Sequence, residues 1–185
     1  MNLQSIECGM TSTTAEGLEE LLPAFHGQNA QVLAYVAAKG SATPDDIRKD
    51  LMIPRSTVYK LLSGFFRIGL AVKKRQGRVD RVSVPDFAFL IKNTAYLGEL
   101  KVTPRNILAF DSIRTPAGRM FAERHGPQKF AKFVELYDNY ERGNTTSQLL
   151  ARELNVTRYE IESLLSDIRT ITPVAIQIGR RPHHR

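Results

Sequence analysis

The side chains best suited to binding chemistry in this sequence are the basic residues of segment 54–84. That segment holds eight Lys or Arg residues against one acidic residue, whereas residues 1–29 hold four acidic residues and no Lys or Arg. The net charge of the whole chain is +7, so the positive charge is concentrated in one short stretch. Clustered cations attract polyanions and displace their counterions. The segment therefore predicts contact with a nucleic acid.

Residues 54–67 predict a helix with two chemically different faces. The apolar face has helical spacing and consists of Val58, Leu61, Leu62 and Phe65. Five of the other side chains are candidates for binding DNA. They are Arg55, Ser56, Thr57, Tyr59 and Lys60. An Arg can pair with guanine and a Ser can bond any base edge, while Lys and Tyr suit phosphates. Burial of Tyr59 at the edge of the apolar face is a second interpretation that the pattern leaves open.

Residues 70–84 predict a β-hairpin whose tip is Gln76-Gly77, because apolar and polar residues alternate on the return strand and Pro85 ends it. Its basic residues are Lys73, Lys74, Arg75, Arg78 and Arg81. Cations at a hairpin tip suit the phosphate backbone, where they would supply affinity that does not depend on sequence.

The helices that must position the basic helix at 54–67 and the basic hairpin at 70–84 precede them in the sequence. Residues 29–39 predict a helix that Gly40 ends, and residues 44–51 predict a second helix with Thr43 as its cap and Pro44 at its first position. Helix, helix, turn, helix and hairpin is the order of a winged helix-turn-helix, whose third helix enters the major groove. We therefore expect residues 29–85 to form such a domain, in a fold that is mainly α with a small β-wing.

The stretch from Ile53 to Leu62, followed by Gly69-Leu70-Ala71, resembles the winged helix of the IclR, MarR and TrmB groups of transcriptional regulators. The resemblance covers about residues 30–85. It implies a DNA-binding fold without fixing one family. The remainder of the chain is shorter than an IclR-like effector domain, so the resemblance does not imply small-molecule sensing.

The second half predicts further helices and a second helix-turn-helix. We expect helices at 86–98, 115–125 and 128–141, with 106–110 either strand or helix. Residues 86–127 would then connect the winged helix to an assembly domain at 128–179. The aromatic residues of 128–141 offer more apolar surface than one short helix pair covers, which suits a partner chain.

Positions 147–161 repeat the turn and core pattern of 43–58, with Arg158 in the place of Arg55 and Ile161 in the place of Val58. This second unit could assemble the protein or read DNA through Thr157, Arg158 and Tyr159. Residues 143–170 hold three basic and four acidic side chains, which favours assembly. Residues 174–178 could form one strand of a reduced wing.

The remaining features exclude other function classes. The chain has one Cys, four His residues without ligand spacing, no phosphate-binding glycine loop and no nucleophile motif, so we expect no enzyme, metal or cofactor. We expect an acidic, partly flexible arm at 1–28, a basic tail at 180–185, no membrane segment and a cytoplasmic location.

The sequence thus predicts a sequence-specific protein for double-stranded DNA, acting as a homodimeric transcriptional regulator. The alternative is a tandem winged-helix protein of replication initiation or DNA segregation. A lesser alternative is a protein-interaction adaptor.

Overall fold

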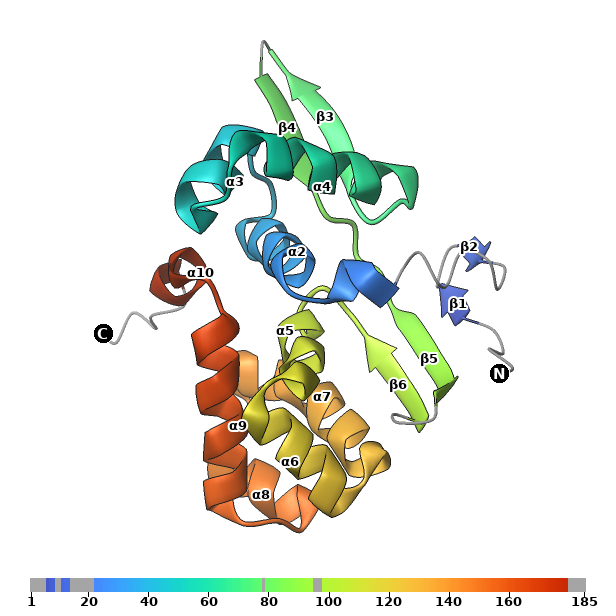
Figure 1. The fold of residues 1–185 in the computed structure, drawn as a ribbon, viewed down its shortest axis with the longest axis vertical. Coiled ribbons are helices and arrows are strands. Elements are labelled where there is room, and N and C mark those ends of the chain that lie inside the picture. Colours follow the sequence, from blue (N-terminus) through green and yellow to red (C-terminus); the bar gives the residue numbers. More distant parts are fainter. Residues whose placement is uncertain (1–5, 9–10, 14–21, 78, 95–97, 180–185) are drawn as a thin grey trace.

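The computed structural model describes residues 6–8, 11–13, 22–77, 79–94 and 98–179. Figure 1 shows an elongated molecule with the winged helix at its upper end and a group of helices at its lower end. The tail at 180–185 and most of the arm at 1–28 lie outside the described residues.

The winged helix is present as predicted. Its helices are α2 (Gln28–Lys39), α3 (Pro44–Leu51) and α4 (Arg55–Arg67), and its wing consists of β3 (Val72–Gln76) and β4 (Val79–Ser83). Thr43 caps α3 by accepting a hydrogen bond from the Asp46 amide, and the Asp46 carboxylate accepts one from the Thr43 amide in return. Ala42 pairs with Val82 through two backbone hydrogen bonds, which fix the wing to the start of α3.

The expected helix at 86–98 is wrong, because this segment forms strands. The strands β5 (Phe89–Thr94) and β6 (Gly98–Val102) pair antiparallel, and β5 also pairs with β1 (Ile6–Cys8), which pairs with β2 (Thr11–Thr13). Leu100 and Val102 of β6 are fully buried, and β6 packs on α7 (Pro127–Glu141). A short apolar run forms a strand or a helix according to its partners, and here these include β1 and α7, which lie far away in sequence, as well as the adjacent strand.

The helical half begins at α5 (Ile107–Asp111), so the ambiguous 106–110 segment is helical. After the short 3-10 turn η2 (Ser112–Arg114) come α6 (Pro116–His125) and α7. The expected second helix-turn-helix is α8 (Ser147–Leu154) and α9 (Arg158–Ile171).

The strand expected at 174–178 is wrong, because α10 (Val174–Gly179) is a helix. No strand in the described part of the chain pairs with this segment. Instead α10 packs on α3 and α2, where Ile176 is buried. The Gln31 side chain of α2 also donates a hydrogen bond of 2.9 Å to the Ile171 carbonyl at the end of α9. The last helices therefore brace the winged helix directly.

The aromatic residues of α7 are largely covered within the chain, and Tyr140, which is half-buried, packs against the same core. Phe130 and Phe133 are fully buried, Tyr137 is buried, and Phe133 packs against Phe121 of α6 with 6.1 Å between ring centres. The expectation that this helix offers spare apolar surface to a partner chain is therefore wrong. A single buried core also runs from the winged helix into the helical half, through residues such as Phe25, which packs on Phe110.

Candidate nucleic-acid interface

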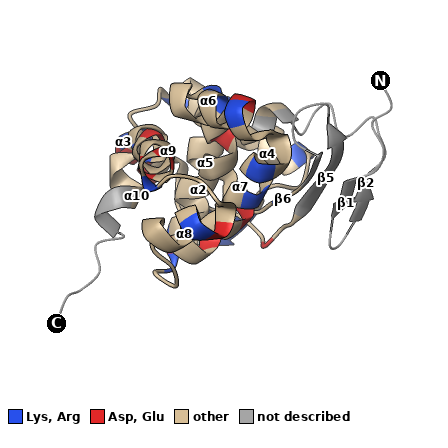
Figure 2. Cartoon of the chain, turned by 90° about the horizontal axis from the view of Figure 1, so that it is seen from below, with Lys and Arg blue, Asp and Glu red and all other residues tan. Residues whose placement is uncertain are grey.

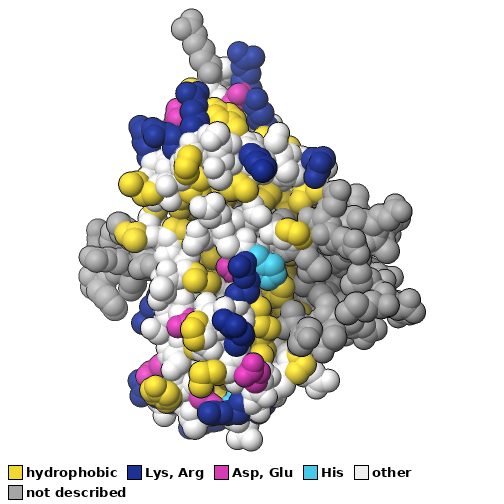
Figure 3. Space-filling model, viewed as in Figure 1, with side chains coloured by type: hydrophobic (Ala, Val, Ile, Leu, Met, Phe, Trp, Pro, Cys, Tyr) yellow, Lys and Arg dark blue, Asp and Glu magenta, His cyan; other side chains and the backbone are white. Residues whose placement is uncertain are grey.

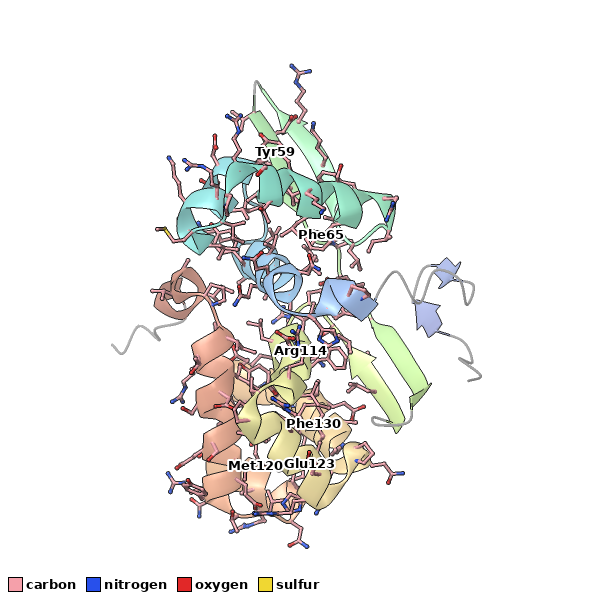
Figure 4. All side chains as sticks on the ribbon, in the orientation of Figure 1. Tyr59, Phe65, Arg114, Met120, Glu123 and Phe130 are labelled. Carbon is pink, nitrogen blue, oxygen red and sulfur yellow. The ribbon has the colours of Figure 1, made fainter. Side chains whose placement is uncertain are left out.

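Helix α4 separates its apolar and polar faces as the sequence predicts. Val58, Leu62 and Phe65 are buried against the rest of the winged helix, while Leu61 is half-buried. The opposite side of the helix carries the candidate side chains, which are exposed at Arg55, Ser56, Tyr59 and Lys60 and half-buried at Thr57. Tyr59 is 49% exposed, so its burial in the core is excluded. Figure 4 shows Tyr59 and Phe65 on opposite sides of α4.

Arg55 and Tyr59 lie one helical turn apart and contact each other. The Arg55 guanidinium carbon is 5.6 Å from the centre of the Tyr59 ring, a cation–π contact. A hydrogen bond with Tyr59 also raises the pKa of Arg55 above its ordinary value. These contacts restrict the rotamers of an exposed Arg in the first turn of α4, so less entropy is lost when it binds.

The basic side chains of the wing differ in their contacts with neighbouring residues and in their exposure. The Lys73 ammonium lies 2.8 Å from a carboxylate oxygen of Asp80, and Arg81 donates a hydrogen bond of 3.2 Å to the Ser41 hydroxyl. Lys74 and Arg75 are exposed, and Lys74 stands opposite Arg81 in the register of the two strands. Like charges on paired residues repel each other, and a bound polyanion removes that repulsion. Arg78 lies outside the described residues.

The wing, α4 and the start of α3 line a groove of about 290 Å³. Tyr59, Ser63 and Lys73 supply hydroxyl and ammonium donors along it, while Asp45 and Asp80 supply carboxylates. Figure 3 shows the Lys and Arg side chains gathered at the upper end of the molecule, over α3, α4 and the wing. Donors and positive charge on one convex end are the features that phosphate contacts require.

A polar network fixes α3, and through it α4, on α2. The Asp50 carboxylate accepts hydrogen bonds from the Lys39 ammonium at 2.7 Å and from the Tyr35 hydroxyl at 2.5 Å. Both bonds hold the pKa of Asp50 below its ordinary value, and burial raises the pKa of Tyr35. The network was missed from sequence, because nothing in the pattern shows that Lys39 and Asp50 meet across two helices.

The second helix-turn-helix reproduces the backbone of the first. Thr146 caps α8 as Thr43 caps α3, and the amides that follow the two turns bond back to corresponding carbonyls. These bonds join Ile53 to Arg48 at 3.2 Å and Val156 to Ala151 at 3.0 Å. Each position in the second unit lies 103 residues after its counterpart, so the correspondence of Arg55 with Arg158 holds in space.

The surface of the second unit differs from that of the first. Thr157 caps α9, Arg158 is paired with Glu162 at 2.6 Å, and Tyr159 is 79% exposed. Helix α6 lies along α9, where the Glu160 carboxylate contacts Arg124 and His125. Figure 2 views the molecule from below relative to Figure 1, and it shows acidic and basic residues mixed on α6 and α8.

The described residues contain no group of three or more His, Cys, Asp or Glu side chains arranged to hold a metal ion. Among the helices within the described ranges, none has the length and apolar character that crossing a bilayer requires.

Comparison with known families gives separate matches for the winged helix and for the helical half. Residues 25–87 match the family model described as sugar-specific transcriptional regulator TrmB. Residues 119–174, from α6 to the first residue of α10, match a family of unknown function (DUF7437). Curated proteins and solved structures give no match. The first match confirms the resemblance to winged-helix transcriptional regulators and points to a DNA-binding regulator of transcription.

Proposed function

We propose that this chain binds double-stranded DNA at specific sequences by placing α4 in the major groove and the wing along the sugar-phosphate backbone. The observation that carries the proposal is the division of α4 into a buried apolar face and an exposed face with Arg55, Ser56, Tyr59 and Lys60. The major groove admits one α-helix, and base edges are read by the side chains at its start.

Each side chain has a role that its chemistry suits. Arg55, Ser56 and Thr57 lie in the first turn of α4 and would contact base edges. Tyr59 and Lys60 would contact phosphates on either side of the groove. The wing residues Lys73, Lys74, Arg75, Arg78 and Arg81 would supply affinity that does not depend on sequence.

In this proposal the protein is a homodimer, because one recognition helix reads too few base pairs to select a unique site. It regulates transcription in the cytoplasm. The word sugar in the family description is not carried over, since the match covers only the winged helix.

The experiment selects bound sites from random double-stranded DNA and then measures affinity for the selected and a scrambled site. Arg55→Ala should weaken binding to the selected site by about 1–3 kcal/mol and hardly change binding to the scrambled one. Arg119→Ala, an exposed Arg on α6, is the matched control and should change neither. Equal losses on both sites would reduce Arg55 to a phosphate contact.

A tandem reader of replication or segregation is the second candidate, and the matched backbone of the two helix-turn-helix units favours it. Two observations count against it: α6 covers part of α9, and α4 and the start of α9 lie at opposite ends of the molecule (Figure 1). In the full chain, Arg158→Ala with Tyr159→Ala should leave the length of the DNA footprint unchanged. A shorter footprint would favour the tandem reader.

A further inference from the structure

The one acidic residue of segment 54–84, Asp80, lies on the wing among its basic side chains. In the register of the hairpin, Asp80 stands directly opposite Arg75, and Lys73 stands opposite Val82. Residues that are paired across strands or two apart along a strand share a face, so all four lie on the same face of the wing. Val82 is buried, so this face of the wing turns toward the helices.

On that face Asp80 forms an ion pair with Lys73. The Lys73 ammonium nitrogen lies 2.8 Å from Oδ2 of Asp80, and 54% of the Lys73 side chain and 46% of the Asp80 side chain are exposed. Both side chains line the groove between the wing and α4, together with Tyr59. An ion pair this exposed to water is weak, so a phosphate that enters the groove can replace the carboxylate.

We propose that Asp80 limits the DNA affinity of the protein, because it pairs with Lys73 until a DNA phosphate takes its place. This inference rests on the proposed function and deepens it by giving the wing cations unequal shares of the affinity. Contact between Lys73 and a phosphate has two costs: the ion pair is broken, and the Asp80 carboxylate is left close to a like charge. Lys74 lies on the other face, opposite Arg81, so its contact with a phosphate instead relieves a repulsion.

The consequence is a limit on affinity that does not depend on sequence. Phosphate contacts are the same at every DNA site, so a carboxylate among them weakens binding to all sites alike. The base contacts that α4 makes then supply a larger share of the total affinity.

The first test is Asp80→Asn in the full chain, which removes the charge and keeps the size of the side chain. Binding to the selected site and to the scrambled site should both tighten, by up to about fivefold, the range of an exposed ion pair. The slope of log K against log salt should steepen by up to about 0.9, the value of one added phosphate contact. Weaker binding to the selected site alone would mean that Asp80 accepts from a base, and would overturn the proposal.

A double-mutant cycle with Lys73→Ala separates the ion pair from the general loss of a negative charge. Lys73→Ala should weaken DNA binding less in the unaltered chain than in the Asp80→Asn protein, because only in the latter is Lys73 free of its carboxylate partner. Asp45→Asn is the matched control, since Asp45 lines the same groove but lies 3.7 Å from Arg48. Its presence should not change the effect of Lys73→Ala. The proposal is overturned if the effect of Lys73→Ala is also the same with and without the Asp80 charge.

Heparin chromatography of the same proteins tests the ion pair without DNA, because heparin is a polyanion that has no base edges. Asp80→Asn should elute at higher salt than the unaltered chain, and adding Lys73→Ala should remove that gain. Circular dichroism verifies folding, and Asp80→Ser replaces Asp80→Asn if the latter fails to fold. An unchanged elution of the folded variants would overturn the proposal. A chain that shows the shift on heparin but binds neither DNA site would instead refute the proposed function and leave the competition for Lys73 in place.

Discussion

Met52 and Asn155 occupy the same step of two helix-turn-helix units and share a left-handed backbone, with φ of 55° and 49°. Each ends the first helix of its unit, and each is followed by an amide that bonds back into that helix. Among the described residues, they are the non-glycine positions with positive φ. The turn therefore demands this conformation, although only Asn adopts it readily.

Met52→Asn should stabilise the protein by about 0.5–1 kcal/mol, because Asn tolerates the left-handed region better than Met does. Met52 is 88% exposed, so the substitution removes little packing. Urea unfolding measures the change, with Asn155→Met expected to destabilise by a similar amount. If both substitutions left the free energy of unfolding unchanged, strain at this turn would be ruled out as a cost.

Replacing two neighbouring exposed wing cations together, by Lys74→Ala and Arg75→Ala, should lower the salt dependence of DNA binding. The slope of log K against log salt should fall by about 1.8, at about 0.9 for each phosphate that the protein no longer neutralises. Affinity titrations over a range of salt concentrations measure the slope. Lys129→Ala with Lys132→Ala on α7 is the control. An unchanged slope in the wing variant would mean that the wing does not touch the backbone.

Glu160 should make the protein sensitive to acid. Its bonds to His125, to the Thr157 amide and to Arg124 lower its pKa from 4.5 to about 2. Because the folded pKa is the lower one, this stabilisation is complete above about pH 4.5 and is lost as the pH falls toward 2. Unfolding measured across that interval should show a shallower pH dependence in Glu160→Gln. Identical pH curves for the unaltered protein and Glu160→Gln would show that Glu160 does not contribute to the loss of stability in acid.

Gly118→Ala should destabilise the protein strongly, by about 3 kcal/mol or more. A Cβ at this position in α6 would lie 1.8 Å from the carbonyl oxygen of Ser112, and backbone cannot move aside easily. Gly64→Ala in α4 is the matched control, since a Cβ there meets nothing within 4 Å, and it should stabilise by up to about 1 kcal/mol. Thermal unfolding compares the two, and a tolerated Gly118→Ala would contradict this packing.

The helices of the winged domain could be predicted closely because their signals are local. The cap at Thr43, the first-turn Pro44 and the apolar spacing of α4 lie within the segments that they define. The exposed side of α4 follows from the same spacing, so its candidate residues could be named from sequence. Their roles in DNA binding remain predictions.

The elements that were predicted incorrectly from the sequence depend on contacts between distant segments. β5 pairs with β1, about eighty residues earlier, and Ile176 is buried by helices more than a hundred residues earlier. Likewise Glu160 is one of the four acidic side chains counted in 143–170, and the sequence does not show that Arg124 and His125 of α6 bind it. Periodicity reports which residues are apolar, but it does not report what covers them.

The packing of α10 on α2 and α3 bears on the order of events during biosynthesis. The winged helix leaves the ribosome long before Ile176, so its α3 surface stays uncovered while the helical half is made. Nascent segments generally fold as units in the order of their synthesis. The winged helix should therefore gain full protease resistance only once α10 has emerged from the ribosome, which ties its complete folding to the synthesis of the Val174–Gly179 segment.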